Sequence, residues 1–401
     1  MPANLAAGSR GHLALVEATG LEAAREDAPA AARRLAPVFA GRAKEHDVGG
    51  TFPHDNVADL HGSGLVALTV PAAAGGGGAG LATATSVVGA LAVGDASTAL
   101  VLAMQYVHHA GIARSASWSR QLARAVQREA VEDGALLNIL RVEPELGSPA
   151  RGGLPATIAR RVGAEWRVSG RKIYSTGAPG LAAGLVWART EGAEPEVGLF
   201  LVPMRVGGVA IEETWDQLGM RASGSHDVVL DDVAIPLDHA VDLRAPAEWA
   251  SPDPDYLAWN TTLIASVYDG VARAARDWFV AFTRERAPSN LGAPLATLPR
   301  FQDVAGEIER LLFVNARLLL GAAEAADRGA PHPPAESGFV KLTVTENAIA
   351  VVQRIVEAAG NPGLSRSQPL ERHLRDVLCA RIHTPQADSV RLAAGRAALS
   401  P

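Results

Sequence analysis

The chain has 401 residues, 48% hydrophobic and 20% charged, which is enough for two or three domains around a large buried core. Its net charge of -6 argues against nucleic acid or an anionic membrane as a partner, because both would require clustered basic residues. A single cysteine, Cys379, allows neither an internal disulfide nor a cysteine-based metal site, and no signal-like or membrane-spanning apolar run occurs, so we expect no metal and a cytoplasmic protein.

The spacing of apolar residues changes twice along the chain. In the alanine-rich residues 21–130 it is three to four, which predicts amphipathic helices. The glycines of residues 75–78 lie in a loop, for which a phosphate-binding role is the alternative to a plain connector, although no Gly-Lys-Ser/Thr follows. Between residues 136 and 243 the period approaches two, with glycine and proline between the alternating stretches.

Helical spacing resumes after Pro236. It predicts four helices suited to a bundle, over residues 260–286, 298–328, 336–359 and 370–398. We therefore predict an α+β protein in three domains. These are an N-terminal all-helical domain (residues 1–135), a central antiparallel β-barrel or sandwich (residues 136–243) and a C-terminal four-helix bundle (residues 244–401).

One predicted strand ends in Tyr174, Ser175 and Thr176 and is followed by Gly177. Amides and hydroxyls at a strand end can hold a flat ring system with donors at its edge. These could equally be ordinary strand residues, which are common in barrels. The whole stretch Trp-Arg-Val-Ser-Gly-Arg-Lys-Ile-Tyr-Ser-Thr-Gly, with the later Leu-Gly-Met-Arg-Ala-Ser-Gly-Ser-His-Asp, resembles the flavin-facing β-domain of the acyl-CoA dehydrogenase superfamily.

That resemblance covers nearly the whole chain and implies a flavin cofactor, FAD or FMN. It places the aromatic ring of Tyr174 against the isoalloxazine and the hydroxyl or amide of Thr176, and next of Ser175, near the flavin N5. Residues 140–148 resemble the family's Thr-Glu-Pro loop, with Val142 in place of the usual hydroxyl and Ser148 able to reach a cofactor or substrate oxygen. A simple turn is the alternative reading of that loop.

Two C-terminal segments resemble further cofactor contacts of the family. Arg286, before an Asn-Leu-Gly-Ala-Pro-Leu stretch, matches the arginine that grips the flavin pyrophosphate of a neighbouring subunit, which implies a homodimer or homotetramer. Gly360 lies in a loop that matches one packed against the dinucleotide. A cation at a helix end and a helix cap are the respective alternatives.

The dehydrogenases of this family need a carboxylate base to remove an α-proton from an acyl thioester. The resemblance puts that base most often at about Thr384, and in a minority of relatives at about Asn260. Neither side chain accepts a proton at neutral pH. A dehydrogenase would then use an unrecognised base, for example Glu371, Asp376 or Asp269, and a non-catalytic flavin- or acyl-CoA-binding relative is a further alternative.

The turn Arg-Ile-His-Thr at residues 381–384 is similar instead to that of reduced-flavin-dependent monooxygenases on this fold, of the dibenzothiophene monooxygenase type. We therefore expect an oxygenase that acts on a small organosulfur, amine or aromatic substrate through a C4a-peroxyflavin, with reduced flavin supplied by a reductase. The resemblance makes His383 and Thr176 the groups that hold the peroxyflavin, and His109 or its neighbour His108 a residue beside the pocket. A lone histidine is, however, commonly a satisfied or exposed residue.

Overall fold

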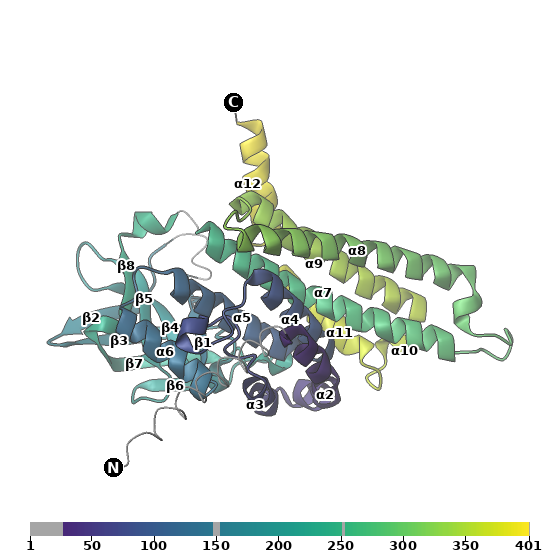
Figure 1. The fold of residues 1–401 in the computed structure, drawn as a ribbon, viewed down its shortest axis with the longest axis horizontal. Helices are drawn as coiled ribbons and strands as arrows, with labels where there is room; N and C mark the ends of the chain where they lie inside the picture. The colour runs from purple at the N-terminus through teal and green to yellow at the C-terminus, as the bar shows by residue number, and fades with distance from the viewer. Residues whose placement is uncertain (1–26, 147–152, 251–252, 401) are drawn as a thin grey trace, which may run out of the picture.

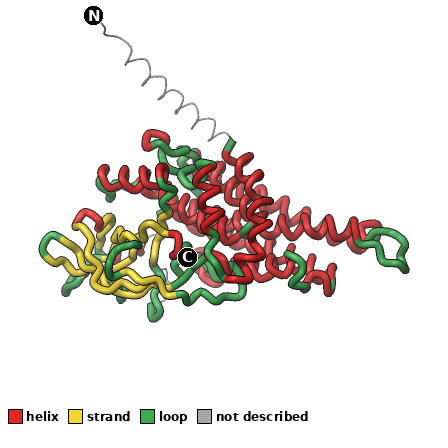
Figure 2. The backbone as a smooth tube through the Cα atoms, turned by 90° about the horizontal axis from the view of Figure 1, so that it is seen from below, coloured by secondary structure: helices red, strands yellow, loops and turns green. Residues whose placement is uncertain are grey.

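The computed structural model describes residues 27–146, 153–250 and 253–400. Helical regions lie on one side of a single large sheet and extend away from it (Figures 1 and 2). The first helical region contains α2 (Ala28–Gly49), α3 (His54–Gly62), α4 (Leu81–Gly94), α5 (Ala96–Arg114) and α6 (Arg120–Glu132). Helix α5 begins where the side chain of Asp95 accepts hydrogen bonds from the amides of Ser97 and Thr98.

The glycine loop before α4 is a connector. Its amides are used internally, since Gly76, Gly77 and Gly78 donate to carbonyl oxygens of the preceding residues 67–71 at 2.7–3.2 Å. A side chain at Gly76 would meet the carbonyl oxygen of Val70 at 2.3 Å, so the chain needs glycine to fold back on itself here. No free amide cradle for a phosphate is left at these three positions.

The central sheet has the strand order β6-β7-β3-β2-β4-β5-β8, with β1 paired to β4. Pairs β2·β3, β3·β7, β4·β5, β5·β8 and β6·β7 are antiparallel, whereas β1·β4 and β2·β4 are parallel. The strands are β1 (Leu136–Leu140), β2 (Ile158–Val162), β3 (Glu165–Lys172), β4 (Leu181–Thr190), β5 (Val197–Pro203), β6 (Val209–Glu212), β7 (Asp227–Pro236) and β8 (Ala240–Arg244). The sheet is therefore mixed, not wholly antiparallel as expected, because β1 and β2 both run in the same direction as β4.

The C-terminal region packs long helices against one another and against α4 and α5. Its helices are α7 (Pro254–Glu285), α8 (Pro299–Asp327), α9 (Pro334–Ala359), α10 (Asn361–Leu364), α11 (Leu370–Leu378) and α12 (Ala387–Leu399). The predicted fourth helix over residues 370–398 is two helices, because Pro385 lacks an amide hydrogen and disfavours helical backbone at Thr384. Helix α12 extends away from the bundle (Figure 1). The predicted helical, β, helical fold class is confirmed.

The loop between β6 and β7 contacts both the strand end singled out above and the C-terminal helices, and its residues 219–226 are called the joining loop. Residues 219–226 receive hydrogen bonds from that strand end, where the amide of Gly177 donates to the carbonyl oxygen of Ser223 at 2.9 Å. On the other side, a side chain at Gly219 would meet the carbonyl oxygen of Arg375 in α11 at 2.3 Å. Close packing on both sides fixes the strand end relative to the C-terminal helices.

Candidate functional site

The predicted strand end at residues 174–176 lies in the turn directly after β3, which ends at Lys172, and this turn, still called the strand end, forms the centre of the candidate site. Tyr174 has a left-handed backbone, with φ at 57°, and its side chain is 56% exposed beside Trp215, with ring centroids 6.1 Å apart. Ser175 is buried, its amide donates to the carbonyl oxygen of His226 at 3.1 Å, and its hydroxyl has no hydrogen-bond partner among the described residues. An exposed aromatic face therefore lies next in the chain to an unsatisfied buried hydroxyl.

Hydroxyl groups continue from this strand end into the joining loop. Thr176 Oγ1 lies 3.1 Å from Ser225 Oγ, which lies 2.8 Å from Ser223 Oγ. The side-chain amide of Asn138 in β1 donates to the carbonyl oxygen of Thr176 at 2.9 Å. The contact with Ser225 orients the Thr176 hydroxyl, and the Asn138 bond holds the backbone of Thr176. The three hydroxyls form a series in which each can donate to the next.

Val142, the loop residue predicted to lie near the cofactor, is beside the same strand end. Its carbonyl oxygen accepts a hydrogen bond from the amide of Ile173 at 2.9 Å. The next residue, Glu143, is buried and binds Lys172 Nζ at 2.5 Å and Thr157 Oγ1 at 2.6 Å. This buried pair ties the loop to β3, and the Lys172 ammonium and the hydrogen bonds lower the pKa of Glu143 against the effect of burial. Ser148 lies outside the described residues.

Helix α5 brings two neighbouring histidines into the interior. His108 Nε2 lies 3.0 Å from the Asn138 side-chain oxygen, which links α5 to the strand end through Asn138. His109 is fully buried, and neither ring nitrogen has a hydrogen-bond partner within residues 27–146, 153–250 and 253–400. Burial lowers the pKa of His109 to about 3, so its ring is neutral at pH 7.

The turn after α11 brings His383 against α7. The rings of His383 and Tyr268 have centroids 5.7 Å apart, and burial and the Lys341 ammonium lower the pKa of His383 to about 4. The side-chain amide of Asn260 lies 3.5 Å from the carbonyl oxygen of Thr384. The two positions that the resemblance gives for a carboxylate base are thus neighbours in space, and neither carries an acid.

The remaining predicted cofactor residues lie elsewhere. Arg286 is the exposed residue that follows α7, and Gly360 follows α9 with φ at 66°. Both helix ends lie at the end of the bundle farthest from the sheet (Figure 1). One chain therefore does not bring Arg286 and Gly360 to Thr176, and the cofactor role predicted for Arg286 requires a second subunit.

Three carboxylates were alternatives for the base. Glu371 binds Arg375 at 2.8 Å, and Asp269 binds Arg273 at 2.6 Å. Nine residues of helix separate Asp269 from Asn260, so their side chains leave α7 on opposite sides. Asp376 is buried and accepts a hydrogen bond from the amide of Met220 at 2.6 Å, and burial raises its pKa to about 7. Of these three carboxylates, Asp376 is the one whose hydrogen bond reaches the joining loop, at Met220.

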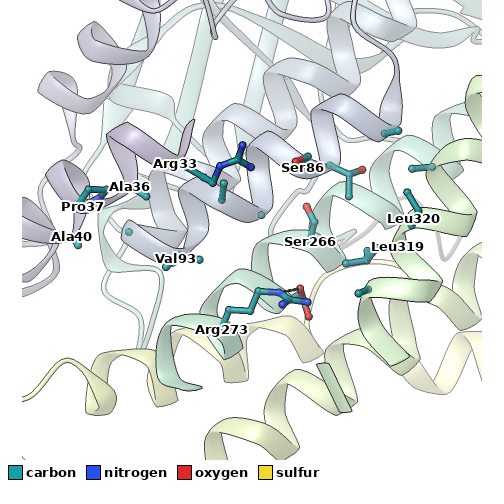
Figure 3. Close-up of a pocket in the computed structure, with 18 residues that line it drawn as sticks. Arg33, Ala36, Pro37, Ala40, Ser86, Val93, Ser266, Arg273, Leu319 and Leu320 are labelled. Carbon is teal, nitrogen blue, oxygen red and sulfur yellow. Dashed lines mark hydrogen bonds and ion pairs between the residues drawn. The ribbon is translucent and has the colours of Figure 1, made fainter. Parts of the chain in front are cut away.

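A separate groove of about 840 Å³ lies among α2, α4, α7 and α8 (Figure 3). Arg33, Ser86, Ser266 and Arg273 border it, together with alanines and leucines. Because Asp269 also lines it, this groove is on the side of α7 opposite Asn260. It is therefore distinct from the candidate site at the strand end.

Sequence reasoning missed several residues that organise the site: Asn138, Ser223, Ser225, Tyr268 and Lys341. The two serines lie in the segment that carried the resemblance, so their spacing around Gly224 was an available signal. The other three are single polar residues inside apolar strands or helices. Nothing local distinguishes such a residue from one that is satisfied within its own element.

Comparison with known proteins identifies the class. Family models for the N-terminal, middle and C-terminal domains of acyl-CoA dehydrogenase match residues 22–121, 140–233 and 262–386. YdbM of Bacillus subtilis (strain 168), whose name assigns it provisionally to the acyl-CoA dehydrogenases, is 37% identical over 88% of this chain and 92% of its own. The chain belongs to the acyl-CoA dehydrogenase family, whose members include flavin-dependent oxidoreductases.

Other relatives carry different names. The L-evernosamine nitrososynthase of Micromonospora sp. is 31% identical over 90% of this chain and 87% of its own. The structure of KijD3 in complex with FMN and a dTDP-amino-keto sugar is 28% identical, covers 93% of both chains and has a TM-score of 0.81. The residues present here fit a flavin, because the exposed ring of Tyr174 adjoins the unpartnered buried hydroxyl of Ser175 within the described chain.

No described helix is both long and apolar enough to cross a membrane.

Proposed function

We propose that this chain is a flavin-dependent monooxygenase that acts on a small organosulfur, amine or aromatic substrate and receives reduced flavin from a reductase. The observation that carries the proposal is the contact between Asn260 and Thr384. At the place where dehydrogenases of this family need a carboxylate, the chain presents an amide and a hydroxyl. An oxygenase requires no base for an α-proton.

The residues at the strand end would hold the flavin. Tyr174 would cover part of the ring, and the hydroxyls of Ser175 and Thr176 would bind its polar edge. When bound in reduced form, the flavin supplies the electrons that activate O2. Ser225 and Asn138 keep Thr176 in place, through its hydroxyl and its carbonyl oxygen respectively.

The two histidines would act on the substrate side. With pKa values of about 4 and about 3, His383 and His109 are neutral at pH 7 and can each donate one N–H while accepting at the other nitrogen. His383 can thus pass a proton on by accepting it at one ring nitrogen while it releases the proton of the other, which leaves no net charge in an apolar pocket. Low water content around these rings would favour oxygen transfer over release of peroxide.

A direct experiment tests the oxygenase against the dehydrogenase. Purified protein is supplied with FMN or FAD, an unrelated reductase and NADH, and oxygen uptake is measured with and without candidate amines and thiophenes. We expect a hydroxylated, nitroso or sulfoxide product that contains ¹⁸O from ¹⁸O2. Anaerobic bleaching of bound oxidised FAD by an acyl-CoA, with formation of the enoyl product, would instead establish a dehydrogenase.

The dehydrogenase remains the second candidate, because YdbM is 37% identical and carries that name. Asp376 would be its base, since this buried carboxyl has its pKa raised to about 7 and adjoins the joining loop.

We further propose a homodimer or homotetramer, in which Arg286 of one chain reaches the flavin of another. Light scattering of the flavin-loaded wild type and of Arg286→Ala would test this assembly and its link to cofactor binding.

A further inference from the structure

Lys341 is a buried lysine in the middle of the C-terminal bundle. It lies on α9, and only 2% of its surface is exposed. Burial lowers its pKa to about 8, and the ion pairs found among the described residues give it no acidic partner. Burying an ammonium group is costly unless its hydrogen bonds are satisfied, so its surroundings must supply acceptors.

The acceptors all come from the turn that carries His383. Lys341 Nζ donates to the carbonyl oxygens of Ala380 at 3.0 Å, His383 at 2.8 Å and Pro385 at 3.2 Å. An ammonium group has three hydrogens, so these bonds use its full donor capacity. These carbonyl groups lie in the segment after helix α11, and without Lys341 their oxygens would lack a hydrogen-bond donor among the described residues.

We propose that Lys341 is the positioning residue of the candidate site: its ammonium group gathers three carbonyl oxygens of residues 380–385 and so holds the His383 ring against Tyr268 and toward the substrate. This inference rests on the proposed role of His383. The geometry ties one point on α9 to both sides of the histidine, since one acceptor precedes it and another follows it. A turn held at three points keeps one conformation, which a catalytic side chain requires.

The same contact sets the charge around His383. Burial lowers the pKa of His383, and the Lys341 ammonium on α9 lowers it further. From α7 the neighbouring titratable group is Tyr268, whose pKa burial raises so that its ring stays neutral. Arg381, on the same turn, is exposed. Removal of the ammonium would therefore raise the pKa of His383 and also release its backbone, and these two effects can be measured separately.

The first measurement needs no flavin. Diethyl pyrocarbonate labels neutral imidazoles, so the pH dependence of labelling at the peptide that contains His383, read by mass spectrometry, reports its pKa. In Lys341→Met we expect labelling to be several-fold faster at high pH and its midpoint to move upward toward 6.5. Lys341→Arg keeps the charge and should leave the midpoint low. An unchanged rate and midpoint in folded Lys341→Met would overturn the proposal.

The second measurement follows turnover. In Lys341→Met we expect kcat to fall about tenfold or more while KM changes less, because the substrate-binding surface stays and the orientation of His383 is lost. Thr345→Val is the matched control, since Thr345 is buried one turn along α9 and donates to carbonyl oxygens of its own helix at Lys341 and Leu342. It should keep the wild-type kcat and labelling profile.

The outcomes separate this proposal from the proposed function. A shifted labelling profile in Lys341→Met, in a protein that shows no oxygenase activity, would retain the positioning role and reject the oxygenase. Oxygenase activity with equal kcat in wild type and Lys341→Met would retain the oxygenase and reject the positioning role of Lys341. If Lys341→Met does not fold, Lys341→Gln supplies a neutral donor, and its labelling profile and kcat are judged by the same two criteria.

Discussion

The side-chain amide of Asn260 and the carbonyl oxygen of Thr384 lie 3.5 Å apart, although the residues are 124 positions apart in the chain. The contact joins the first helix of the C-terminal region to the turn after α11. The family resemblance gives both places as alternatives for the base of α-proton removal. Their meeting here, with no acid at either, is the reason to expect a different reaction.

We predict that the wild-type protein does not catalyse exchange of acyl-CoA α-protons with D2O. Asn260 and Thr384 cannot remove such a proton, because neither ionises near neutral pH. Proton NMR of butyryl-CoA incubated with the flavin-loaded protein is the measurement. Exchange that is present in the wild type and lost in Asp376→Asn would contradict the oxygenase and make Asp376 the base.

We predict that His383→Gln lowers the rate of product formation by about 10²-fold, the usual contribution of one acid–base group. Glutamine retains a hydrogen-bonding group but cannot exchange a proton at neutral pH. His239→Gln is the control, because His239 binds the carbonyl oxygen of Leu201 beside β8 and is not among the proposed site residues. Equal losses in the two variants would point to a general structural effect.

We predict that Ser175→Ala and Thr176→Val each weaken flavin binding by about 1 kcal/mol, or about fivefold in Kd. Without flavin, Ser175→Ala should not lower the melting temperature, since the hydroxyl it removes has no partner among the described residues. Flavin fluorescence titration and differential scanning fluorimetry measure the two effects. Ser169→Ala, in the exposed part of β3, should leave the Kd unchanged.

We predict that His109→Leu stabilises the flavin-free protein while it reduces activity. The substitution replaces a fully buried ring, without hydrogen bonds in the described chain, by an apolar side chain of similar size, which should gain about 1 kcal/mol. The melting temperature would rise by about 1 °C, because the entropy of unfolding of a 401-residue chain is large. His109→Gln, which leaves a buried amide, should not produce this rise. A lower melting temperature in His109→Leu would mean that the ring is satisfied in solution.

We predict that stability falls as pH decreases below 6.5. Burial lowers the pKa of four histidines to about 3 or 4, namely His108, His109, His373 and His383. Between those values and 6.5 the unfolded chain binds more protons than the native one, so stability is lost on acidification, by about 1.4 kcal/mol per pH unit for each proton. Asp376, with its pKa raised to about 7, acts in the opposite direction between pH 7 and 3.8. The stability lost through the four histidines exceeds the stability gained through Asp376.

Urea unfolding at pH 7.5 and 5.0 checks this prediction. The free energy of unfolding should be smaller at pH 5.0, and His109→Leu should reduce the difference because it removes one of the four groups. Equal stability at the two pH values would show that these imidazoles are hydrated or paired in solution.

The sequence by itself determined the order of helical, β and helical regions and the strand end at Tyr174 to Thr176, because periodicity and short motifs depend on neighbours along the chain. It also showed that positions 260 and 384 carry no acid. It overextended the last helix through Pro385 and expected a wholly antiparallel sheet, since the two parallel partners of β4, β1 and β2, are chosen by packing.

Only the tertiary structure decided which distant polar groups meet. Asn138 reaches Thr176 from β1, Asn260 reaches Thr384 from α7, and Lys341 reaches the His383 turn from α9. Each partner is a single polar residue on an otherwise ordinary strand or helix, and its hydrogen bonds exist only once the elements have packed. A buried donor must find its acceptor across that packing, and no local pattern in the sequence names the acceptor.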